Sequence, residues 1–184
     1  MQRVLIIGCS GAGKSTLARE LSERSGLPLI HLDQHYWRPG WIPRQEDEWG
    51  AAVQTLTAGP AWVMDGNYTR TLAPRVAAAD TVVFFDFPAW RCLWRVCRRA
   101  VQWFGHTRHD MTPGCPERLT LSFIRYVARF NRDQRPRVLA SLAAFEGRLI
   151  VLRSPTEAAA FLRSVGRDEP GAAPRSARSG AGCS

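Results

Sequence analysis

A run of glycines around a single lysine is the part of this chain best suited to chemistry. Residues 8–16 read Gly-Cys-Ser-Gly-Ala-Gly-Lys-Ser-Thr, and Lys14 is the only lysine among 25 Lys and Arg residues. Glycines let successive backbone N–H groups curve around a phosphate chain, a lysine here reaches its terminal oxygens, and the following hydroxyl can bind Mg²⁺. The pattern G-x-x-x-x-G-K-[ST] is complete and predicts nucleoside triphosphate binding. The expected contacts are Gly8, Ser10, Gly11, Ala12, Gly13, Lys14, Ser15 and Thr16.

The elements around this loop fit its role. The short apolar run 3–7 predicts a buried parallel strand, and residues 15–24 predict a helix with leucines at positions 17 and 21. Farther along, apolar runs alternate with helical patterns, which predicts an α/β fold with a five-stranded parallel sheet flanked by helices. The expected strands are 3–7, 28–31, 61–64, 81–85 and 148–152. The expected helices are 15–24, 45–57, 71–78, 89–103, 117–133, 136–145 and 156–165.

Two further features complete the predicted organisation. Residues 34–43 and 105–116 have the composition of loops. We expect one domain over residues 1–165, with an arginine-rich helical lid at about 99–132. The Gly/Ala/Pro/Ser/Arg-rich stretch 166–184 predicts a disordered tail.

Three carboxylates follow the ends of predicted strands. Asp33, Asp65 and Asp86 each come directly after an apolar run. In open α/β sheets, ligands bind at the carboxyl ends of the strands. We therefore expect these side chains to converge near the glycine-rich loop.

Charge and cysteine content narrow the class of protein. The formal net charge is +9, but residues 1–90 carry eight Lys/Arg against nine Asp/Glu, while residues 91–137 carry eleven arginines against three acids. This local excess suits the phosphates of a bound nucleotide. No apolar stretch approaches the roughly 20 residues that span a bilayer. Five cysteines at irregular positions do not make a disulfide framework. We expect a cytoplasmic protein with no membrane partner.

Together these motifs resemble the adenylate-kinase-like P-loop kinases, and more closely a bacterial subgroup labelled as DNA-topology-modulation proteins. The resemblance covers about residues 3–163. It rests on the glycine-rich loop and on six further segments. These are His31-Leu-Asp33 with Trp37-Arg-Pro-Gly-Trp41, Trp62–Tyr68, Phe85–Trp90, Arg91–Arg99, Gly114–Glu117 and the arginine-rich stretch 125–137.

The resemblance implies roles for several residues. Lys14 and the loop amides would hold the donor phosphates, and Ser15 would bind Mg²⁺ with the help of Asp86 or Asp33. Asp65, Gly66, Asn67 and Arg70 resemble the acceptor motif Asp-Gly-Phe-Pro-Arg. Here Asn-Tyr-Thr replaces Phe-Pro and moves the arginine one residue along, so a nucleotide and a small metabolite both stay open as acceptors.

The lid and the acceptor side complete the implied site. Arg95 and Arg99 are four residues apart and share a helix face. They match arginines that would contact adenine and phosphate, and Ser154-Pro155 matches the adenine loop. Arg132 and Arg135 would clamp the transferring group. Asp33 would either act as a base toward an acceptor hydroxyl or assist Mg²⁺, and Trp37 could line the acceptor pocket.

The leading hypothesis is an ATP- and Mg²⁺-dependent kinase that transfers the γ-phosphoryl group to a nucleotide or small metabolite. The alternative is a nucleic-acid-associated ATP-binding factor, in which the arginines of 91–137 contact a DNA backbone. The sequence contains no recognisable DNA-reading module, so nucleic acid is not the favoured partner. We expect a monomer or a small homo-oligomer.

Overall fold

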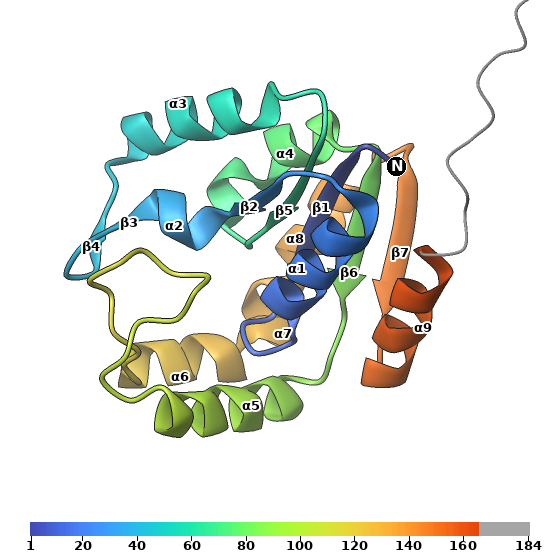
Figure 1. The fold of residues 1–184 in the computed structure, drawn as a ribbon. Coiled ribbons are helices and arrows are strands. Elements are labelled where there is room, and N and C mark those ends of the chain that lie inside the picture. Colours follow the sequence, from blue (N-terminus) through green and yellow to red (C-terminus); the bar gives the residue numbers. More distant parts are fainter. Residues whose placement is uncertain (166–184) are drawn as a thin grey trace, which may run out of the picture.

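A parallel sheet of five strands forms the centre of the computed structural model, which describes residues 1–165 (Figure 1). The strand order is β2-β5-β1-β6-β7, and every neighbouring pair is parallel. The predicted fold class is therefore confirmed. The predicted tail, 166–184, lies outside the described residues. The strands of this sheet are β1 (Arg3–Gly8), β2 (Leu29–His31), β5 (Trp62–Asp65), β6 (Thr81–Phe85) and β7 (Arg148–Leu152).

Alternating side chains of the central strands build two apolar cores, one on each face of the sheet. Val4 and Ile6 of β1 pack with the cluster that includes residues of α1 and α9, whereas Leu5 and Ile7 pack with residues of α3, α4 and α8. Because β1 is covered on both faces, it reads as a continuous apolar run. The helices around the sheet are α1 (Lys14–Ser25), α3 (Glu46–Thr57), α4 (Leu72–Ala78), α5 (Ala89–Gln102), α8 (Arg135–Leu142) and α9 (Pro155–Val165).

The segment predicted as one long helix over 117–133 is divided. The first piece, α6 (Leu121–Ala128), begins after Thr120, whose hydroxyl accepts a hydrogen bond from the N–H of Phe123 at 3.3 Å. A short second helix, α7 (Phe130–Asp133), follows after Arg129. Glu117 is not helical, because its backbone forms a parallel bridge with Phe104. Arg125, Arg132 and Arg135 of the arginine-rich stretch 125–137 therefore lie on three separate helices.

The predicted loop at 34–43 contains regular structure. A short helix, α2 (Leu32–Tyr36), follows β2 directly, and a small antiparallel hairpin joins β3 (Trp37–Arg38) to β4 (Ile42–Pro43). The hairpin turns through Gly40 and Trp41, both at positive φ. A sequence pattern of period two or 3.6 cannot be recognised in pieces this short.

This hairpin is fastened to the loop that joins α5 to α6, residues 103–120, which we call the lid loop. The N–H of Gly40 donates to the carbonyl of Gly114 at 2.9 Å, and the indole N–H of Trp41 donates to the carbonyl of Pro116 at 2.9 Å. The hydroxyl of Thr112 donates to the carbonyl of Trp37 at 2.7 Å. The lid loop and the hairpin therefore lie together over the carboxyl edge of the sheet (Figure 1). Within residues 1–165, no helix has the length and apolar character needed to cross a bilayer.

Candidate active site

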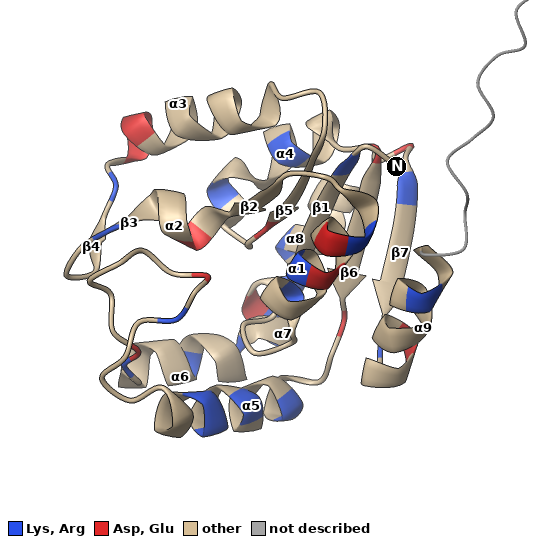
Figure 2. Ribbon diagram, viewed as in Figure 1, with Lys and Arg blue, Asp and Glu red and all other residues tan. Residues whose placement is uncertain are grey.

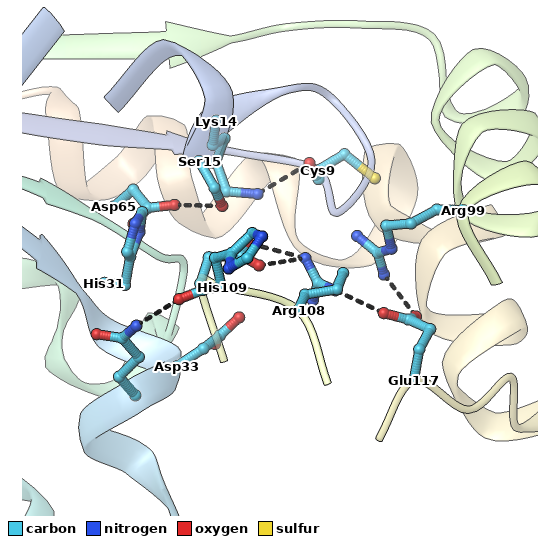
Figure 3. A network of polar contacts seen from close by, with 12 residues as sticks. Cys9, Lys14, Ser15, His31, Asp33, Asp65, Arg99, Arg108, His109 and Glu117 are labelled. Atoms are coloured by element: carbon cyan, nitrogen blue, oxygen red, sulfur yellow. Dashed lines mark hydrogen bonds and ion pairs between the residues drawn. The ribbon is translucent and has the colours of Figure 1, made fainter. Parts of the chain in front are cut away.

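The glycine-rich loop connects β1 to α1 in the order that the sequence predicts. Its turn is closed by the N–H of Ala12, which donates to the carbonyl of Cys9 at 3.1 Å. Gly11 has φ +83°, and a Cβ there would lie 2.5 Å from the carbonyl oxygen of Cys92, so this position requires glycine. The ammonium group of Lys14 donates to the carbonyl of Cys9 at 3.0 Å. The lysine is thus held at the mouth of its own loop (Figure 3).

A chain of three side chains runs away from this loop. The hydroxyl of Ser15 donates to Oδ2 of Asp65 at 2.7 Å, and Oδ1 of Asp65 lies 2.5 Å from Nδ1 of His31 (Figure 3). Burial disfavours the charged form of His31, but the hydrogen bond and the negative charge of Asp65 outweigh it and raise the pKa of His31. Asp65 is thereby fixed between a hydroxyl and an imidazole.

The loop after β5 is held by a fully buried arginine, Arg75, on α4. Its guanidinium donates to the carbonyls of Gly66 at 2.9 Å, Tyr68 at 2.9 Å and Thr71 at 3.0 Å, and also to that of Asn67. The exposed fraction of Arg75 is 0%. Burial lowers the pKa of Arg75, while the carbonyls satisfy its donors. Arg75 therefore fixes the backbone that carries the predicted acceptor motif.

Two residues of that loop reach other parts of the site. Oδ1 of Asn67 accepts a hydrogen bond from the N–H of Gly8 at 2.9 Å, which joins the acceptor motif to the start of the glycine-rich loop. A Cβ at Gly66 would lie 2.8 Å from Cβ of Leu32, so the chain can pass α2 closely only with glycine here. The motif thus links the donor and acceptor sides.

Asp33 lies on α2, and one of its two carboxylate oxygens accepts a hydrogen bond. The hydroxyl of Tyr68 donates to its Oδ1 at 2.5 Å. Burial raises the pKa of Asp33 above its usual value, and the hydrogen bond from Tyr68 opposes this rise. Tyr68 has φ +31°, a conformation uncommon for a bulky residue.

The lid loop brings a second ionic network to the site. Arg108 donates to Oε2 of Glu117 at 2.6 Å and to both carboxylate oxygens of Asp110 at 2.8 Å, and Arg99 donates to Oε1 of Glu117 at 3.1 Å. Burial favours the protonated form of Asp110, but the positive charge of Arg108 outweighs it and lowers the pKa of Asp110. Gln34 of α2 donates to the carbonyl of His109 at 2.7 Å. The lid loop therefore contacts α2 through His109 (Figure 3).

A cavity of about 630 Å³ lies on the other side of the glycine-rich loop. Arg95 lines this cavity and also contacts the glycine-rich loop, because its guanidinium donates to the carbonyl of Ala12 at 3.1 Å. The same guanidinium lies 5.8 Å from the ring centre of Phe87. The structure thus brings the predicted nucleotide contacts Arg95, Ser154 and Pro155 into one cavity wall. The lining residues are Trp90, Arg91, Trp94, Arg95, Ser154, Pro155 and Thr156.

Several predicted residues are not brought to the Ser15–Asp65 pair. Asp86 was predicted as a Mg²⁺ ligand, but Arg135 holds both of its oxygens, at 2.7 and 2.9 Å. The structure therefore places Asp65, rather than Asp86, beside Ser15. Hydrogen bonding to Arg135 is the main reason that the pKa of Asp86 is lowered, and burial opposes it.

Arg132 and Arg70 also point elsewhere. The side chain of Arg132 is 68% exposed and pairs with the adjacent Asp133. The side chain of Arg70 is 78% exposed and pairs with Glu46 at the start of α3. Trp37 packs edge-on against Tyr36 and Trp41, with ring centres 4.9 and 5.2 Å apart. None of these side chains contacts Lys14 or Asp65 among the described residues.

Four residues of the site are not among those predicted from the sequence: Arg75, Arg108, Asp110 and Glu117. Arg75 stands three residues after Leu72 and one before Val76, so helical spacing could have placed it on the buried face of α4. Arg108, Asp110 and Glu117 lie in or beside a segment read only as a loop. Their opposite charges are visible in the sequence, but the fold of the loop that brings them together is not.

Comparisons with solved structures agree with this architecture. The shikimate kinase of Acinetobacter baumannii, solved in complex with shikimate, matches with a TM-score of 0.56 and 18% identity over 90% of each chain. The shikimate kinase of Aquifex aeolicus matches with a TM-score of 0.51 and 14% identity, covering 89% of this chain and 93% of that one. This chain has the fold of the P-loop kinases. At such identities, similarity establishes the fold alone.

Comparisons of the sequence with known proteins do not assign the chain to a family. No family model matches the chain. The chain is 30% identical over 109 residues to the uncharacterized protein YqaC of Bacillus subtilis (strain 168). That match covers 57% of this chain and 60% of the Bacillus protein, which is less than two thirds of its length.

Proposed function

We propose that this protein is an ATP-dependent phosphotransferase that transfers the γ-phosphoryl group of ATP to a small metabolite. The observation that carries the proposal is the position of Ser15. Its hydroxyl lies 2.7 Å from the carboxylate of Asp65, next to Lys14 and at the carboxyl edge of the sheet. The P-loop kinase fold supports it, because shikimate kinases share that fold. In such folds, ligands bind at this edge.

The donor side follows from the glycine-rich loop. The loop amides and Lys14 would hold the β- and γ-phosphates. The purine would enter the cavity beside Arg95, Ser154 and Pro155. Arg99 would face the phosphates from α5, since its Nε is buried and lacks a hydrogen-bond partner among the described residues.

The donor set around Ser15 fits a magnesium ion. A hydroxyl and a carboxylate are the hard oxygen ligands that Mg²⁺ takes together with substrate phosphates. Ser15 and Asp65 would hold the ion, and His31 would fix the orientation of Asp65. When bound, Mg²⁺ neutralises the charge of the phosphate oxygens.

The lid loop would exclude water from the transfer. It is fastened to the β3–β4 hairpin and to Gln34 of α2. Water exclusion matters because hydrolysis competes with transfer to the acceptor. Lid loops of this kind commonly open to admit substrate and close for chemistry.

The DNA-binding alternative has less support. Figure 2 shows basic residues along α5. Some arginines of the segment 91–137 are nevertheless paired with acids. Arg99 and Arg108 share Glu117, and Arg135 binds Asp86. Such pairs leave less charge free to neutralise a nucleic-acid backbone.

Binding and turnover of ATP test the proposal together. A non-hydrolysable ATP analogue with Mg²⁺ should raise the melting temperature of the protein, because a ligand that binds only the folded state stabilises it. The same preparation should release ADP from ATP when an acceptor is added. A protein that binds no ATP analogue would contradict the proposal.

A further inference from the structure

The segment that contains β2, β5 and the predicted acceptor motif has few basic residues, and each of them already has a partner. Residues 27–80, which run from just before β2 to just before β6, contain four arginines and no lysine. They also contain six acids, which makes the segment negative by two charges. The acids are Asp33, Glu46, Asp47, Glu48, Asp65 and Asp80.

Each of the four arginines already has a partner within the segment. Arg38 pairs with Glu48 at 2.5 Å, and Arg70 pairs with Glu46 at 2.7 Å. Nε of Arg44 donates to the carbonyl of His35 at 2.9 Å. Arg75 is buried, and its guanidinium donates hydrogen bonds to backbone carbonyls. Proteins recognise phosphate and carboxylate groups through the forked donors of arginine, and here each of the four guanidinium groups already has a partner.

The two arginines that take part in the ionic network of the lid do not supply the missing charge, and Arg118 of the lid loop lies over the ring of Trp41, 5.0 Å from its centre. Arg108 and Arg99 face the site from the lid, and Asp110 and Glu117 neutralise them. Asp110 also adds a carboxylate to those of Asp33 and Asp65. The side chain of Gln34, next to Asp33 on α2, donates to the carbonyl of His109, next to Asp110, which brings this part of the lid loop close to Asp33. A second anion entering there would be repelled by like charge.

Asp33 is held in a way that suits a hydroxyl. Its Oδ1 accepts the hydroxyl of Tyr68, while its Oδ2 has no hydrogen-bond partner among the described residues. Tyr68 keeps its unusual positive φ because Arg75 holds its carbonyl. Backbone strain of this kind persists only where the surroundings fix it and is frequent at functional sites. One carboxylate oxygen is therefore fixed and the other is free to accept a proton.

We infer that the phosphoryl acceptor is an uncharged alcohol, such as a polyol, a sugar or a nucleoside, whose hydroxyl is oriented by Asp33; this inference rests on the proposed kinase function. The acceptor oxygen forms a bond to the γ-phosphorus, and the bond from that phosphorus to the β–γ bridging oxygen breaks. ADP leaves with the electron pair of that bond. The hydroxyl proton passes to Oδ2 of Asp33 and then to solvent.

A transfer assay with γ-labelled ATP tests the acceptor class. The uncharged panel is glycerol, erythritol, myo-inositol, ribose, glucose, adenosine and thymidine, and the anionic panel is AMP, dTMP, shikimate and gluconate. We expect at least one uncharged acceptor to have a kcat/KM at least ten times that of every anionic one. An anionic acceptor that matches or exceeds all of the uncharged ones overturns the inference, as does the absence of transfer to every uncharged member.

A pair of variants tests the role of Asp33. With the best uncharged acceptor, Asp33→Asn should lower kcat by about 10²- to 10⁴-fold, the range of general-base contributions, and leave ATP-analogue binding unchanged. Asp47→Asn makes the same chemical change at an exposed acid of α3 and should retain the parental rate. Equal rates for Asp33→Asn and Asp47→Asn would overturn the role of Asp33.

Different results would contradict the proposed acceptor class and the proposed kinase function. If the protein binds the ATP analogue and phosphorylates AMP or shikimate, the acceptor class is wrong and the kinase function stands. If Lys14→Ala binds the analogue as well as the parent does, and neither transfers phosphate to any member of the panel, the kinase function itself fails.

Discussion

The hydroxyl of Ser15 and the carboxylate of Asp65 lie 2.7 Å apart, although 50 residues separate them in the sequence. The register of the sheet explains this contact. β1 and β5 pair in parallel with Ile6 opposite Asp65, so the end of β5 lies beside the start of the glycine-rich loop. The contact places a carboxylate next to the predicted Mg²⁺ ligand.

Replacing Asp65 should therefore impair metal use. We expect Asp65→Asn to lower kcat by at least about 10²-fold, because even residues that only orient metal ligands contribute about 10- to 100-fold, and to raise the Mg²⁺ concentration needed for half-maximal turnover. Turnover measured across a Mg²⁺ series checks this, with Asp47→Asn as the control. An unchanged Mg²⁺ dependence would show that Asp65 takes no part in holding the ion.

Arg75 should be important for stability. Each buried carbonyl left without a partner costs about 1–3 kcal/mol, and Arg75 serves four. Because relaxation and water entry recover part of this cost, we expect Arg75→Met to lower the free energy of unfolding by about 3–5 kcal/mol, the range for broken buried networks. Urea unfolding measures the change.

The matched control for Arg75 is Arg70→Met. Arg70 pairs with Glu46 in an exposed position, and exposed ion pairs contribute about 0–1 kcal/mol. A loss for Arg75→Met no larger than that for Arg70→Met would contradict the proposed clamp.

The sequence predicted the strands well because each is a continuous apolar run with polar residues at its end. It also predicted the glycine-rich loop, since that motif depends on local spacing. Contacts set by strand order were not predictable, because the sequence does not state that β5 lies next to β1. For the same reason the sequence points to Asp86 or Asp33, rather than Asp65, as the carboxylate that helps Ser15 bind Mg²⁺. The position of Asp110 was missed because it depends on how the lid loop folds.

Stability at acid pH should report the Asp86–Arg135 pair. Hydrogen bonding to Arg135 lowers the pKa of Asp86 in the folded state, so the unfolded chain binds a proton more readily. The stabilisation is present at neutral pH and is lost as the pH falls below about 4, the ordinary pKa of aspartate. We expect about 1 kcal/mol, because water screens the partly exposed Arg135.

Urea unfolding of the parent and of Asp86→Asn between pH 7 and pH 3 measures this effect. The difference between the two proteins should be largest at neutral pH and should shrink toward pH 3. A difference that stays constant or grows on acidification would contradict the assignment.

Two neighbouring arginines of α5 separate the kinase from a DNA-binding factor. Arg99 points to Glu117 within the site, whereas Arg98 is exposed and stacks on Trp94 at 5.6 Å. In a kinase, Arg99→Ala should lower kcat by more than tenfold while ATP binding changes less, because charge develops in the transition state. Arg98→Ala should stay near the parental rate.

A DNA-binding role would give a different pattern. Both substitutions would leave ATP turnover unchanged, and each would reduce the salt slope of DNA binding by about one unit. The paired measurement is ATP turnover with the best acceptor and DNA affinity across a salt series. That second pattern would contradict the role given to Arg99.

Phosphoryl transfer by the parent and by Lys14→Ala is the most direct test of the central claim. Among residues 1–165, the side chain of Lys14 has one hydrogen-bond partner, the carbonyl of Cys9 in its own loop, so its removal should leave the fold and the melting temperature nearly unchanged. With γ-labelled ATP and the acceptor panel, the parent should form labelled product, and Lys14→Ala should form at least 100-fold less. Equal transfer by the two proteins would contradict the claim that this loop carries out phosphoryl transfer from ATP.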